Sequence, residues 1–532
     1  MKKSASIFLG LDSSTQGLKA VAIDARLAVH AEFAVNYDAD LPDYTTRGGV
    51  HHHPDGLTVT APPRMWAEAL DLLLGRMRAA QFPFARVVAI SGSGQQHGSV
   101  YFRRGARGLL NKLDAMFPVS EQLRDAFSVE DSPIWMDSST TDECRRLERA
   151  LGGAQATAAI TGSRAYERFT GNQIAKIARK QKAAYAATEH ISLVSSFMAS
   201  LLIGDYAPID VSDGSGMNVM DIGRRRWCDA ALDACAPGLA PLLGTLALSH
   251  TTAGRIHSRY VERYGFSPDC KVIVFSGDNP NSLAGLRLQE AGDIAISLGT
   301  SDTVFAALAT PRPSASEGHI FASPIDPRGY MALICYKNGS LTREYIRDRA
   351  AGRSWAKFNA LLLTTAPGND GRIGFYYKDP EITPPVMKAG MFRFGADDKP
   401  VKSFIAAQEV RAVVEGQFLS MRLHGCNIGI KPTRILATGG ASANPAIIKI
   451  MSDVFGVPVY TGAIPNSAAL GAAYRALHGW QCDASGKFQP FGDVIKGPSG
   501  FKRAASPDRA AHITYTALLK RYATLEAKIA TY

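Results

Sequence analysis

Short apolar runs flank a turn of small hydroxyl residues at two places in the chain, about half its length apart. The first turn lies within 10–19, between the apolar runs 7–9 and 20–23, and the second lies within 296–303. Two β-rich runs joined by a tight turn predict a β-hairpin. The N–H groups and hydroxyls of such a turn can bind an anion. Two similar hairpins therefore predict a duplicated, two-lobed fold that grips a polyphosphate from both sides.

The rest of the chain alternates between strand and helix patterns, which predicts an α/β architecture. The expected strands are 86–90, 132–137, 271–275, 434–438 and 457–460, and the expected helices are 65–79, 446–455, 467–477 and an amphipathic segment after about 508. We predict a first lobe over 1–290, a second over 291–490, and a helical tail, 491–532, packed on one of them. The segment 41–63, rich in Gly, Pro, Thr and His, is predicted to be an exposed loop.

Composition places the chain among soluble enzymes. It has 532 residues, too many for a single core, with 46% hydrophobic and 20% charged residues. No apolar run reaches the roughly 18 residues of a membrane span. Met1–Ser4 resembles the start of a signal peptide, but Asp12 interrupts the apolar stretch that follows, so we expect no leader. Seven cysteines without a CxxC pair favour reduced thiols and a cytoplasmic protein.

The formal net charge of +11 raises the question of a nucleic-acid partner. Basic clusters occur at 103–107 and 224–226. They can form a nucleic-acid patch or simply solvated loops. Because the chain has no helix-turn-helix, zinc-finger or aromatic-interleaved motif, we expect no nucleic-acid partner. A positive field around the cleft of an anionic substrate would be a modest kinetic benefit.

The turn of the first hairpin combines the carboxylate of Asp12 with hydroxyl groups and a lysine. A carboxylate beside bound phosphates would repel them unless a cation lies between, and Mg²⁺ is held by one or two carboxylates plus phosphate oxygens and water. An ordinary hairpin is the alternative, and recurrence of the turn near Thr300 favours the phosphate site. Asp12 is thus the predicted metal ligand. The residues predicted to bind nucleotide phosphates are Ser14, Thr15, Lys19, Thr300 and Ser301.

Asp278 follows the apolar strand 271–275 and precedes a predicted helix. Ligands bind at such strand ends in α/β sheets. Asp278 is either a helix cap or a catalytic group. Because Asn279 can serve as the cap and Pro280 suits the first helical position, we predict that Asp278 is a general base that takes the proton of a sugar hydroxyl.

Polar and aromatic residues follow two further strands. Gln96 and His97 come after 86–90 through a Gly-Ser-Gly turn, and Trp135 and Asp137 lie at another strand end. Such side chains suit a polyol, although a lone histidine is more often structural. In 439–444, side chains are small enough for an adenine or ribose to lie near the backbone, although Gly-Gly also makes an ordinary strand-to-helix turn.

In this order the motifs resemble those of the FGGY carbohydrate kinases over roughly 7–478. The matching stretches are 133–141 (PIWMDSSTT), 162–176 (GSRAYERFTGNQIAK), 210–218 (DVSDGSGMN) and 435–442 (ILATGGAS). Gln96 before His97, and Met136-Asp137-Ser138, depart from the bacterial pattern and agree with the animal and plant subgroup that acts on D-xylulose. The resemblance implies a duplicated, actin-like, ribonuclease-H-like fold of two lobes with a cleft between them.

The resemblance also implies an activity and site residues. The reaction would convert D-xylulose and ATP, with Mg²⁺, to D-xylulose 5-phosphate and ADP, feeding the pentose phosphate pathway. The implied sugar contacts are His97, Arg168, Asp278 and Asn279, and the implied nucleotide contacts are Trp355, Gly439, Gly440 and Asn444. We expect the sugar in the first lobe and ATP mainly on the second, with the lobes closing so that transfer is in line.

Alternative functions remain open on the sequence. A kinase for another ketose or polyol, such as ribulose or glycerol, differs only in the surroundings of His97, Trp135 and Arg168. An actin- or Hsp70-like nucleotide switch would not need a hydroxyl-recognising loop or a base at Asp278. A catalytically dead sugar sensor is disfavoured because both hairpins and both aspartates are intact. The oligomeric state is also open, with a homodimer as one arrangement.

Overall fold

The computed structural model describes residues 6–462, 464–497 and 500–531. Met1–Ser4, which bear on the prediction that the chain has no signal peptide, lie outside the described residues. The chain forms two compact units. Unit 1 contains the residues up to Gln289 together with Phe321–Gly329 and Pro465–Gly497; unit 2 contains Glu290–Ile320, Tyr330–Ile464 and the residues after Gly497. The described part contains no helix that is both long and apolar enough to span a membrane.

The main sheet of unit 1 is built on the first predicted hairpin. Its strands are β1 (Ile7–Ser13), β2 (Gly17–Asp24), β3 (Val29–Asn36), β6 (Val87–Gly94), β14 (Thr252–Arg255), β15 (Lys271–Ile273) and β16 (Ser276–Gly277). The order is β14-β15-β6-β1-β2-β3, and β16 also pairs with β6. β1 is antiparallel to β2, with Asp12 opposite Lys19, and parallel to β6. The parallel pairing leaves the ends of β1 and β6 at one edge of the sheet.

The sheet of unit 2 repeats this topology. Its strands are β17 (Asp293–Leu298), β18 (Asp302–Leu308), β19 (His319–Ala322), β20 (Tyr330–Tyr336), β23 (Arg434–Thr438), β24 (Val459–Thr461) and β25 (Lys502–Ala505), in the order β19-β20-β18-β17-β23-β24-β25. β17, β18 and β20 form an antiparallel meander, and β17, β23 and β24 are parallel. The series β15-β6-β1-β2-β3 in unit 1 therefore corresponds to β24-β23-β17-β18-β20 here, as the duplication predicts.

Helices cover both sheets. In unit 1 they are α1 (Tyr37–Asp40), α2 (Pro63–Ala79), α3 (Ala106–Leu110), α4 (Val119–Gln122), α5 (Thr141–Ala150), α6 (Ala154–Thr161), α7 (Thr170–Lys180), α8 (Lys182–Ala187), α9 (Val194–Ile203), α10 (Val211–Gly214), α11 (Asp229–Cys235), α12 (Leu239–Leu243), α13 (Ser258–Tyr264), α14 (Asp278–Gly285), α19 (Ser467–Ser485) and α20 (Phe491–Val494). In unit 2 they are α15 (Ser340–Ala350), α16 (Trp355–Leu363), α17 (Ala406–Asn427), α18 (Pro445–Phe455) and α21 (Arg509–Ala530). The predicted helix 65–79 is α2, whose Trp66, Leu70 and Leu73 are fully buried in the core.

Short strands complete both units. In unit 1 they are β4 (His51–His52), β5 (Val59–Ala61), β7 (Ser99–Arg103), β8 (Ser132–Pro133), β9 (Thr188–Leu193), β10 (Ile209–Asp210), β11 (Met220–Asp221), β12 (Arg226–Trp227) and β13 (Leu246–Ala247), and unit 2 adds β21 (Ile373–Tyr377) and β22 (Gly390–Phe394). β4, β5 and β8 form a small sheet. The prediction that 41–63 is an exposed loop is therefore wrong in part, because Val50, Val59 and Ala61 are buried.

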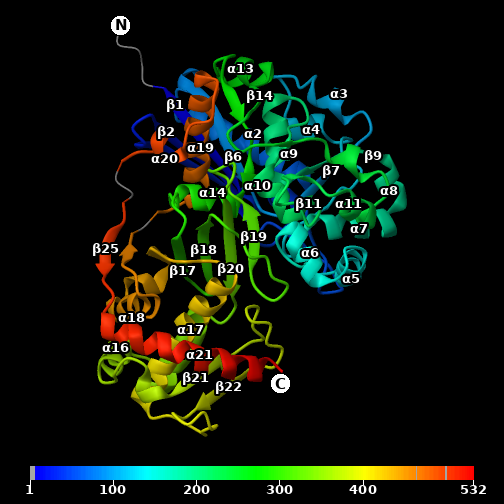
Figure 1. The fold of residues 1–532 in the computed structure, drawn as a ribbon. Coiled ribbons are helices and arrows are strands. Elements are labelled where there is room, and N and C mark those ends of the chain that lie inside the picture. The colour runs from blue at the N-terminus through cyan, green and yellow to red at the C-terminus, as the bar shows by residue number, and fades with distance from the viewer. Residues whose placement is uncertain (1–5, 463, 498–499, 532) are drawn as a thin grey trace. The chain divides into compact units, whose positions relative to one another are not determined.

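The helix α19 departs from the predicted domain boundaries. It packs within unit 1 against β1 and α14, although it lies in the predicted second lobe, 291–490 (Figure 1). A Cβ atom at Gly10 would lie 2.0 Å from Ala469 O, and one at Gly471 would lie 1.8 Å from Asn281 O. These glycines let the backbones approach closely. The predicted boundary at 490 therefore does not coincide with that of the compact unit.

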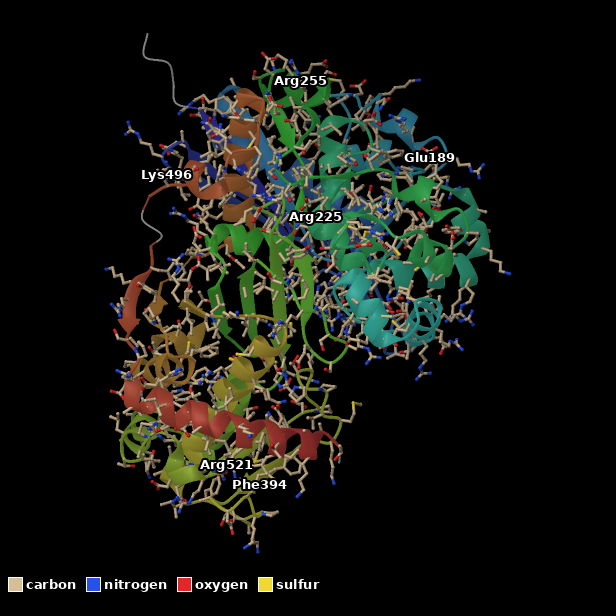
Figure 2. The ribbon with its side chains drawn as sticks, in the orientation of Figure 1. Glu189, Arg225, Arg255, Phe394, Lys496 and Arg521 are labelled. Carbon is tan, nitrogen blue, oxygen red and sulfur yellow. The ribbon has the colours of Figure 1, made fainter. Side chains whose placement is uncertain are left out.

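The predicted tail helix is α21, which packs on α17 and α18 of unit 2. Its buried side chains include Tyr515, Leu518, Tyr522 and Leu525. Arg521 of the same helix donates to the carboxylate of Asp398 and to the carbonyl oxygens of Gly395 and Ala396, just after Phe394 at the end of β22 (Figure 2). The tail is thus joined to unit 2 by apolar packing and by hydrogen bonds.

Candidate active site

Asp12 lies near the end of β1 and is 4% exposed. Its Oδ2 accepts a hydrogen bond from Ser14 Oγ at 2.5 Å, whereas its Oδ1 has no partner among the described residues. Burial raises the pKa of the Asp12 carboxyl, against the lowering effects of Ser14 and of the Lys19 ammonium. An unpartnered buried carboxylate oxygen fits a cation such as Mg²⁺, which takes its remaining ligands from phosphate and water.

A pocket of about 650 Å³ opens at the turn of this hairpin within unit 1, and its lining includes Ser14, Thr15, Lys19 and Trp135. Trp135 Nε1 donates to Thr15 Oγ1 at 2.8 Å, which attaches the loop of Trp135 to the turn. Lys19 Nζ donates to Asn466 Oδ1 at 3.0 Å. The predicted phosphate-binding side chains of the first hairpin are thus brought together around one pocket.

The loop 46–50 also lines this pocket, through Arg47, Gly48 and Val50. Arg47 is exposed and is not one of the predicted site residues. Gly49 has a positive φ of 79°, and a Cβ atom there would lie 2.0 Å from Thr15 O. Only glycine lets the loop lie against the hairpin turn at this point. The Gly48-Gly49 pair was the signal in the sequence, but it does not say which turn the loop would touch.

The Asp278 carboxylate lies at the start of α14, beside the end of β6. Its Oδ1 accepts hydrogen bonds from the backbone N–H of Asn279 at 2.8 Å and of Gln96 at 3.3 Å. Burial, and after it the negative charge of Asp12, raise the pKa of Asp278 to about 7, while the two backbone hydrogen bonds oppose this rise. A general base works best when its pKa is close to the working pH. Asp278 has the properties of such a base.

The prediction that Asn279 caps α14 is wrong. The helix begins at Asp278 itself, and its N-cap residue is Gly277, which has no side chain to donate or accept. Asn279 Nδ2 instead donates to Gln96 Oε1 at 2.8 Å. Asn279 therefore joins the two predicted sugar-contacting segments, the loop after β6 and the start of α14.

Gln96 and His97 lie in the turn between β6 and β7. Gln96 is 2% exposed, and its Nε2 has no partner among the described residues. His97 Nδ1 is 2.9 Å from Gly216 O, and its ring stacks on Phe169 with centroids 4.3 Å apart. Because a carbonyl oxygen only accepts, Nδ1 carries the proton, and Nε2 of the neutral ring is an acceptor. The turn thus supplies one amide donor for ligand hydroxyls and holds the His97 ring in one tautomer beside it.

Arg168 directly precedes Phe169, the residue on which His97 stacks. It is half-buried, and no hydrogen bond or ion pair of its guanidinium is found within the described part of the chain. The guanidinium carries five N–H donors in a fixed geometry. Arg168 is therefore held next to the His97 segment with its donors available to a ligand.

Asp137 does not fit the prediction that it contacts a sugar. It is 1% exposed, and its Oδ1 accepts from Gln173 Nε2 at 2.9 Å and from the Ser139 hydroxyl and N–H at 2.5 and 2.9 Å. Its Oδ2 accepts from Val59 N at 3.2 Å and lies 3.5 Å from Lys176 Nζ. Both oxygens are occupied by the chain itself, so Asp137 holds the Trp135 loop in place.

In unit 2, the turn of the second hairpin is fixed by α15 and α17. Ser340 N, at the start of α15, donates to Gly299 O at 2.8 Å. Arg343, one turn later, pairs with Asp302 after the turn, and Gln417 Oε1 accepts from Arg343 Nη1 at 2.8 Å. The second phosphate turn is thus anchored by a buried ion pair that the hairpin pattern alone did not predict.

A pocket of about 620 Å³ adjoins this turn within unit 2. It is lined by Leu298, Gly299, Thr300, Ser340, Arg343, Glu344, Trp355, Asn359, Gly440, Ala441, Ala443, Asn444, Pro445 and Ile447. Four of the residues predicted to bind the nucleotide, Thr300, Trp355, Gly440 and Asn444, thus line one pocket, while Ser301 and Gly439 are not among the described residues that line it. A volume of this size suits a nucleoside.

Gly439 brings two strands close together next to this pocket, and Trp355 lines it. Gly439 has a positive φ of 81°, and a Cβ atom there would lie 2.5 Å from Leu298 O, so β17 and the end of β23 come close only because this residue is glycine. Trp355 is the first residue of α16, and the Arg347 guanidinium lies 4.8 Å from its ring centroid. The tryptophan is held at the pocket edge, where it can stack on a base.

Several lining residues were missed by sequence reasoning, among them Glu344 and Asn359. The spacing of Trp355 and Asn359, four residues apart on one helix, is the signal that could have found the second of these, because such residues share a helix face. Nothing in the sequence around Glu344 separates it from an ordinary surface glutamate.

Comparison with known proteins shows to which protein family the chain is similar. The model of the FGGY family of carbohydrate kinases, N-terminal domain, matches 125–285, and that of the C-terminal domain matches 294–480. A xylulose kinase of Mus musculus is 53% identical over 98% of this chain and 94% of its own length. Xylulose kinase 2 of Arabidopsis thaliana is 51% identical over 92% of this chain and 90% of its own.

Solved structures confirm the fold. The crystal structure of xylulose kinase from Rhodospirillum rubrum is similar with a TM-score of 0.79, 19% identity, and coverage of 98% of this chain and 99% of that one. At this identity the likeness shows the fold alone. The predicted α/β class, with a duplicated actin-like arrangement of strands, is confirmed.

Proposed function

This chain belongs to the FGGY family of carbohydrate kinases, and from that premise we propose that it transfers the γ-phosphoryl group of ATP to D-xylulose. The products are D-xylulose 5-phosphate and ADP. The observation that carries the proposal is identity above 50% with xylulose kinases of mouse and Arabidopsis over nearly the whole chain. The geometry around Asp278, with a partly buried carboxylate next to a loop of hydroxyl-binding groups, supports it.

In this proposal Asp278 is the general base of unit 1. Its Oδ1 is held by the N–H groups of Asn279 and Gln96, which leaves Oδ2 to take the proton of the attacking hydroxyl. A pKa of about 7 lets the carboxylate be ionised near neutral pH and still bind a proton during the reaction. The proton moves from the sugar oxygen to Oδ2 as the new oxygen–phosphorus bond forms.

The sugar is recognised by donors and acceptors on two loops. Gln96 Nε2 and the Arg168 guanidinium donate to sugar oxygens, and His97 Nε2 accepts from a hydroxyl when the ring is neutral. Asn279 orients Gln96 and lies next to the base. Trp135 contributes an aromatic face at the neighbouring pocket. We do not include Asp137 in the sugar site, because the chain occupies both of its oxygens.

In this proposal residues of the two hairpin turns bind the phosphates, and a separate set of residues binds the nucleoside. Ser14, Thr15 and Lys19 of the first turn, and Thr300 and Ser301 of the second, bind phosphate oxygens, and Trp355, Gly439, Gly440 and Asn444 form the nucleoside site. Asp12 would hold Mg²⁺ through its unpartnered Oδ1, and the ion would neutralise charge on the phosphates. Phosphoryl transfer needs little covalent work from the protein, so positioning and water exclusion supply most of the rate.

The proposal also covers the cellular compartment and the partners of the protein. The seven cysteines all lie in the described part of the chain and form no disulfide there, which supports a reducing compartment, and we propose the cytoplasm. We also propose that the enzyme acts without nucleic acid or membrane. A homodimer stays a prediction, and light scattering of the full chain at micromolar concentration measures it directly.

A panel of acceptors at fixed Mg·ATP tests the function. ADP release is measured with D-xylulose, D-ribulose and glycerol, with the Asp278→Asn variant as the matched control. We expect the highest kcat/KM for D-xylulose and no sugar-dependent ADP release from the variant. A higher kcat/KM for ribulose or glycerol would assign another acceptor within the family. ATP hydrolysis that no sugar changes would favour an actin- or Hsp70-like nucleotide switch instead.

A further inference from the structure

The pocket of unit 2 has two chemically different ends. One end is formed by the hairpin turn at Gly299 and Thr300 and by Ser340, the first residue of α15. The other is formed by α16 and by the segment 440–447, which supplies small residues and Asn444. The N–H groups and hydroxyls of a hairpin turn bind anions, whereas the first N–H groups of α18 at the other end are already capped by Asn444, so phosphates belong to the first end. The second end is left for the nucleoside.

The side-chain amide of Asn444 makes three hydrogen bonds within the protein. Asn444 is the N-cap residue of α18, and its Oδ1 accepts from Ala446 N at 3.0 Å and from Ile447 N at 3.3 Å. Backbone N–H groups can only donate, so the cap fixes which amide atom is the oxygen. Its Nδ2 therefore points the other way, and it donates to Asn359 Oδ1 at 2.7 Å.

This contact in turn fixes the orientation of Asn359. Since Asn444 Nδ2 can only donate, the atom of Asn359 that meets it must be Oδ1. The remaining atom, Nδ2 of Asn359, carries two N–H groups for which the described residues offer no hydrogen-bond partner. Asn359 is half-buried and lines the pocket. The pocket thus contains an oriented donor pair that the protein itself does not use.

The neighbours of Asn359 indicate what this donor meets. Trp355 lies four residues earlier on α16, on the same face, and Arg347 covers one side of its ring. If a base stacks on the indole of Trp355, either the edge of that base or its ribose lies next to Asn359, which is one helical turn further along α16. Gly440 and Ala441 leave room there because they have little or no side chain.

We propose that Asn359 Nδ2 donates a hydrogen bond to an acceptor atom of the bound nucleoside, and that Asn444 positions Asn359 for this contact. The acceptor is a ring nitrogen of the base or an oxygen of the ribose. This inference rests on the proposed function, in which a nucleotide occupies this pocket. It makes Asn359 a nucleotide-binding residue and Asn444 a positioning residue.

The test measures binding of ADP and of uncharged adenosine to the full chain by calorimetry, without sugar. Asn359→Asp keeps an acceptor for Asn444 Nδ2 but removes the donor, whereas Asn359→Ala removes both. We expect both variants to weaken adenosine and ADP binding about 5- to 10-fold, with unchanged melting temperatures. Lys357→Ala, an exposed position on the same helix that does not line the pocket, is the control and should bind as the wild type does.

Analogues identify the acceptor. For the wild type, one of 1-deaza-, 3-deaza- or 7-deaza-adenosine, or 2′-deoxyadenosine, should bind about 5- to 10-fold more weakly than adenosine, and in Asn359→Ala this difference should disappear. The identity of that analogue distinguishes a base contact from a ribose contact. A positioning role for Asn444 predicts that Asn444→Asp, which keeps the cap oxygen, weakens adenosine binding in the wild-type background but not in Asn359→Ala.

Two results would overturn the inference. If Asn359→Asp binds adenosine like the wild type while Asn359→Ala does not, the residue only supports Asn444. If both variants bind like the wild type, Asn359 does not contact the nucleoside, although sugar-dependent ADP release by the wild type would leave the proposed function intact. A wild type that binds neither ADP nor ATP, and phosphorylates no sugar, would remove the proposed function together with this inference.

Discussion

Asp302 and Arg343 form an ion pair in which neither side chain is exposed, with Oδ2 to Nη1 at 2.7 Å and Oδ1 to Nη2 at 3.0 Å. The pair joins the start of β18 to α15, directly behind the second hairpin turn. A Cβ atom at Gly339 would lie 2.8 Å from Asp302 Oδ1 and 2.7 Å from Thr300 O, so the start of α15 packs tightly on this turn. The geometry of the predicted phosphate turn therefore depends on the ion pair.

Removing one member of this pair should destabilise unit 2. Arg343→Met leaves the Asp302 carboxylate buried without its partner, and breaking a buried pair in this way costs about 3–5 kcal/mol. Urea denaturation measures the change in the free energy of unfolding. Lys399→Ala breaks the exposed pair with Asp397 and should leave the free energy of unfolding close to the wild-type value. An Arg343→Met variant as stable as the Lys399→Ala control would contradict the prediction.

Asp278→Asn should lower turnover at least about 100-fold, because the amide cannot accept the proton of the hydroxyl. ADP binding should stay within about twofold of the wild type, since Asp278 belongs to unit 1 and the nucleoside pocket to unit 2. Steady-state kinetics and calorimetry measure the two effects separately. Asp269→Asn, in a mostly exposed pair with Arg255, is the control. Turnover near the wild-type value in Asp278→Asn would exclude it as the base.

The pH dependence of kcat/KM should report the same carboxylate. Burial and the charge of Asp12 raise the pKa of Asp278 to about 7, and the base must be deprotonated to act. The rate constant should therefore be constant above about pH 7 and fall about tenfold for each pH unit below it. A profile between pH 5 and 9 with D-xylulose measures this. A profile that stays flat down to pH 5 would mean that a group with an ordinary carboxyl pKa, or no base, controls the rate.

The strand and turn patterns were sufficient to predict both hairpins and the duplicated sheet, because apolar runs and turn residues act locally. The position of α19 was not predictable in this way. Its packing depends on close approach of backbones at Gly10 and Gly471, and sequence patterns do not say which distant helix a glycine will meet. The predicted boundary at 490 therefore assigned α19 to the second lobe by its place in the sequence, whereas its packing places it in unit 1.

In the candidate site, too, sequence patterns did not predict which distant residues a side chain contacts. The position of Asp278 was predictable because a strand end followed by a helix places its carboxylate at the sheet edge. The role of Asp137 was not, because its partners Val59, Gln173 and Lys176 come from separate segments. The orientation of Asn359 depends on the cap that Asn444 forms, and only the folded chain contains that contact. Residue type indicated which groups bear chemistry, while the hydrogen bonds decide which of them are available.

His424 of α17 lies between two carboxylates, with Nδ1 2.6 Å from Glu317 and Nε2 2.9 Å from Glu526 of α21. Burial alone would lower its pKa, but the hydrogen bonds that the ring donates to the two carboxylates raise the pKa of His424 to about 9. The folded pKa thus lies above the unfolded value of about 6.5. The imidazolium contributes stability that is complete below about pH 6.5 and is lost as the pH rises through 9.

We therefore expect the free energy of unfolding to fall by about 2–3 kcal/mol between pH 6.5 and 9.5, as measured by urea denaturation at fixed ionic strength. His424→Gln cannot become charged, so the variant should be less stable at pH 6.5 and should lose most of this pH dependence. His30→Gln, whose ring is about half exposed beside Asp24, should keep the wild-type slope. If His424→Gln falls in stability as steeply as the wild type over this range, the imidazolium between Glu317 and Glu526 does not hold α21 on α17, and another group titrates there.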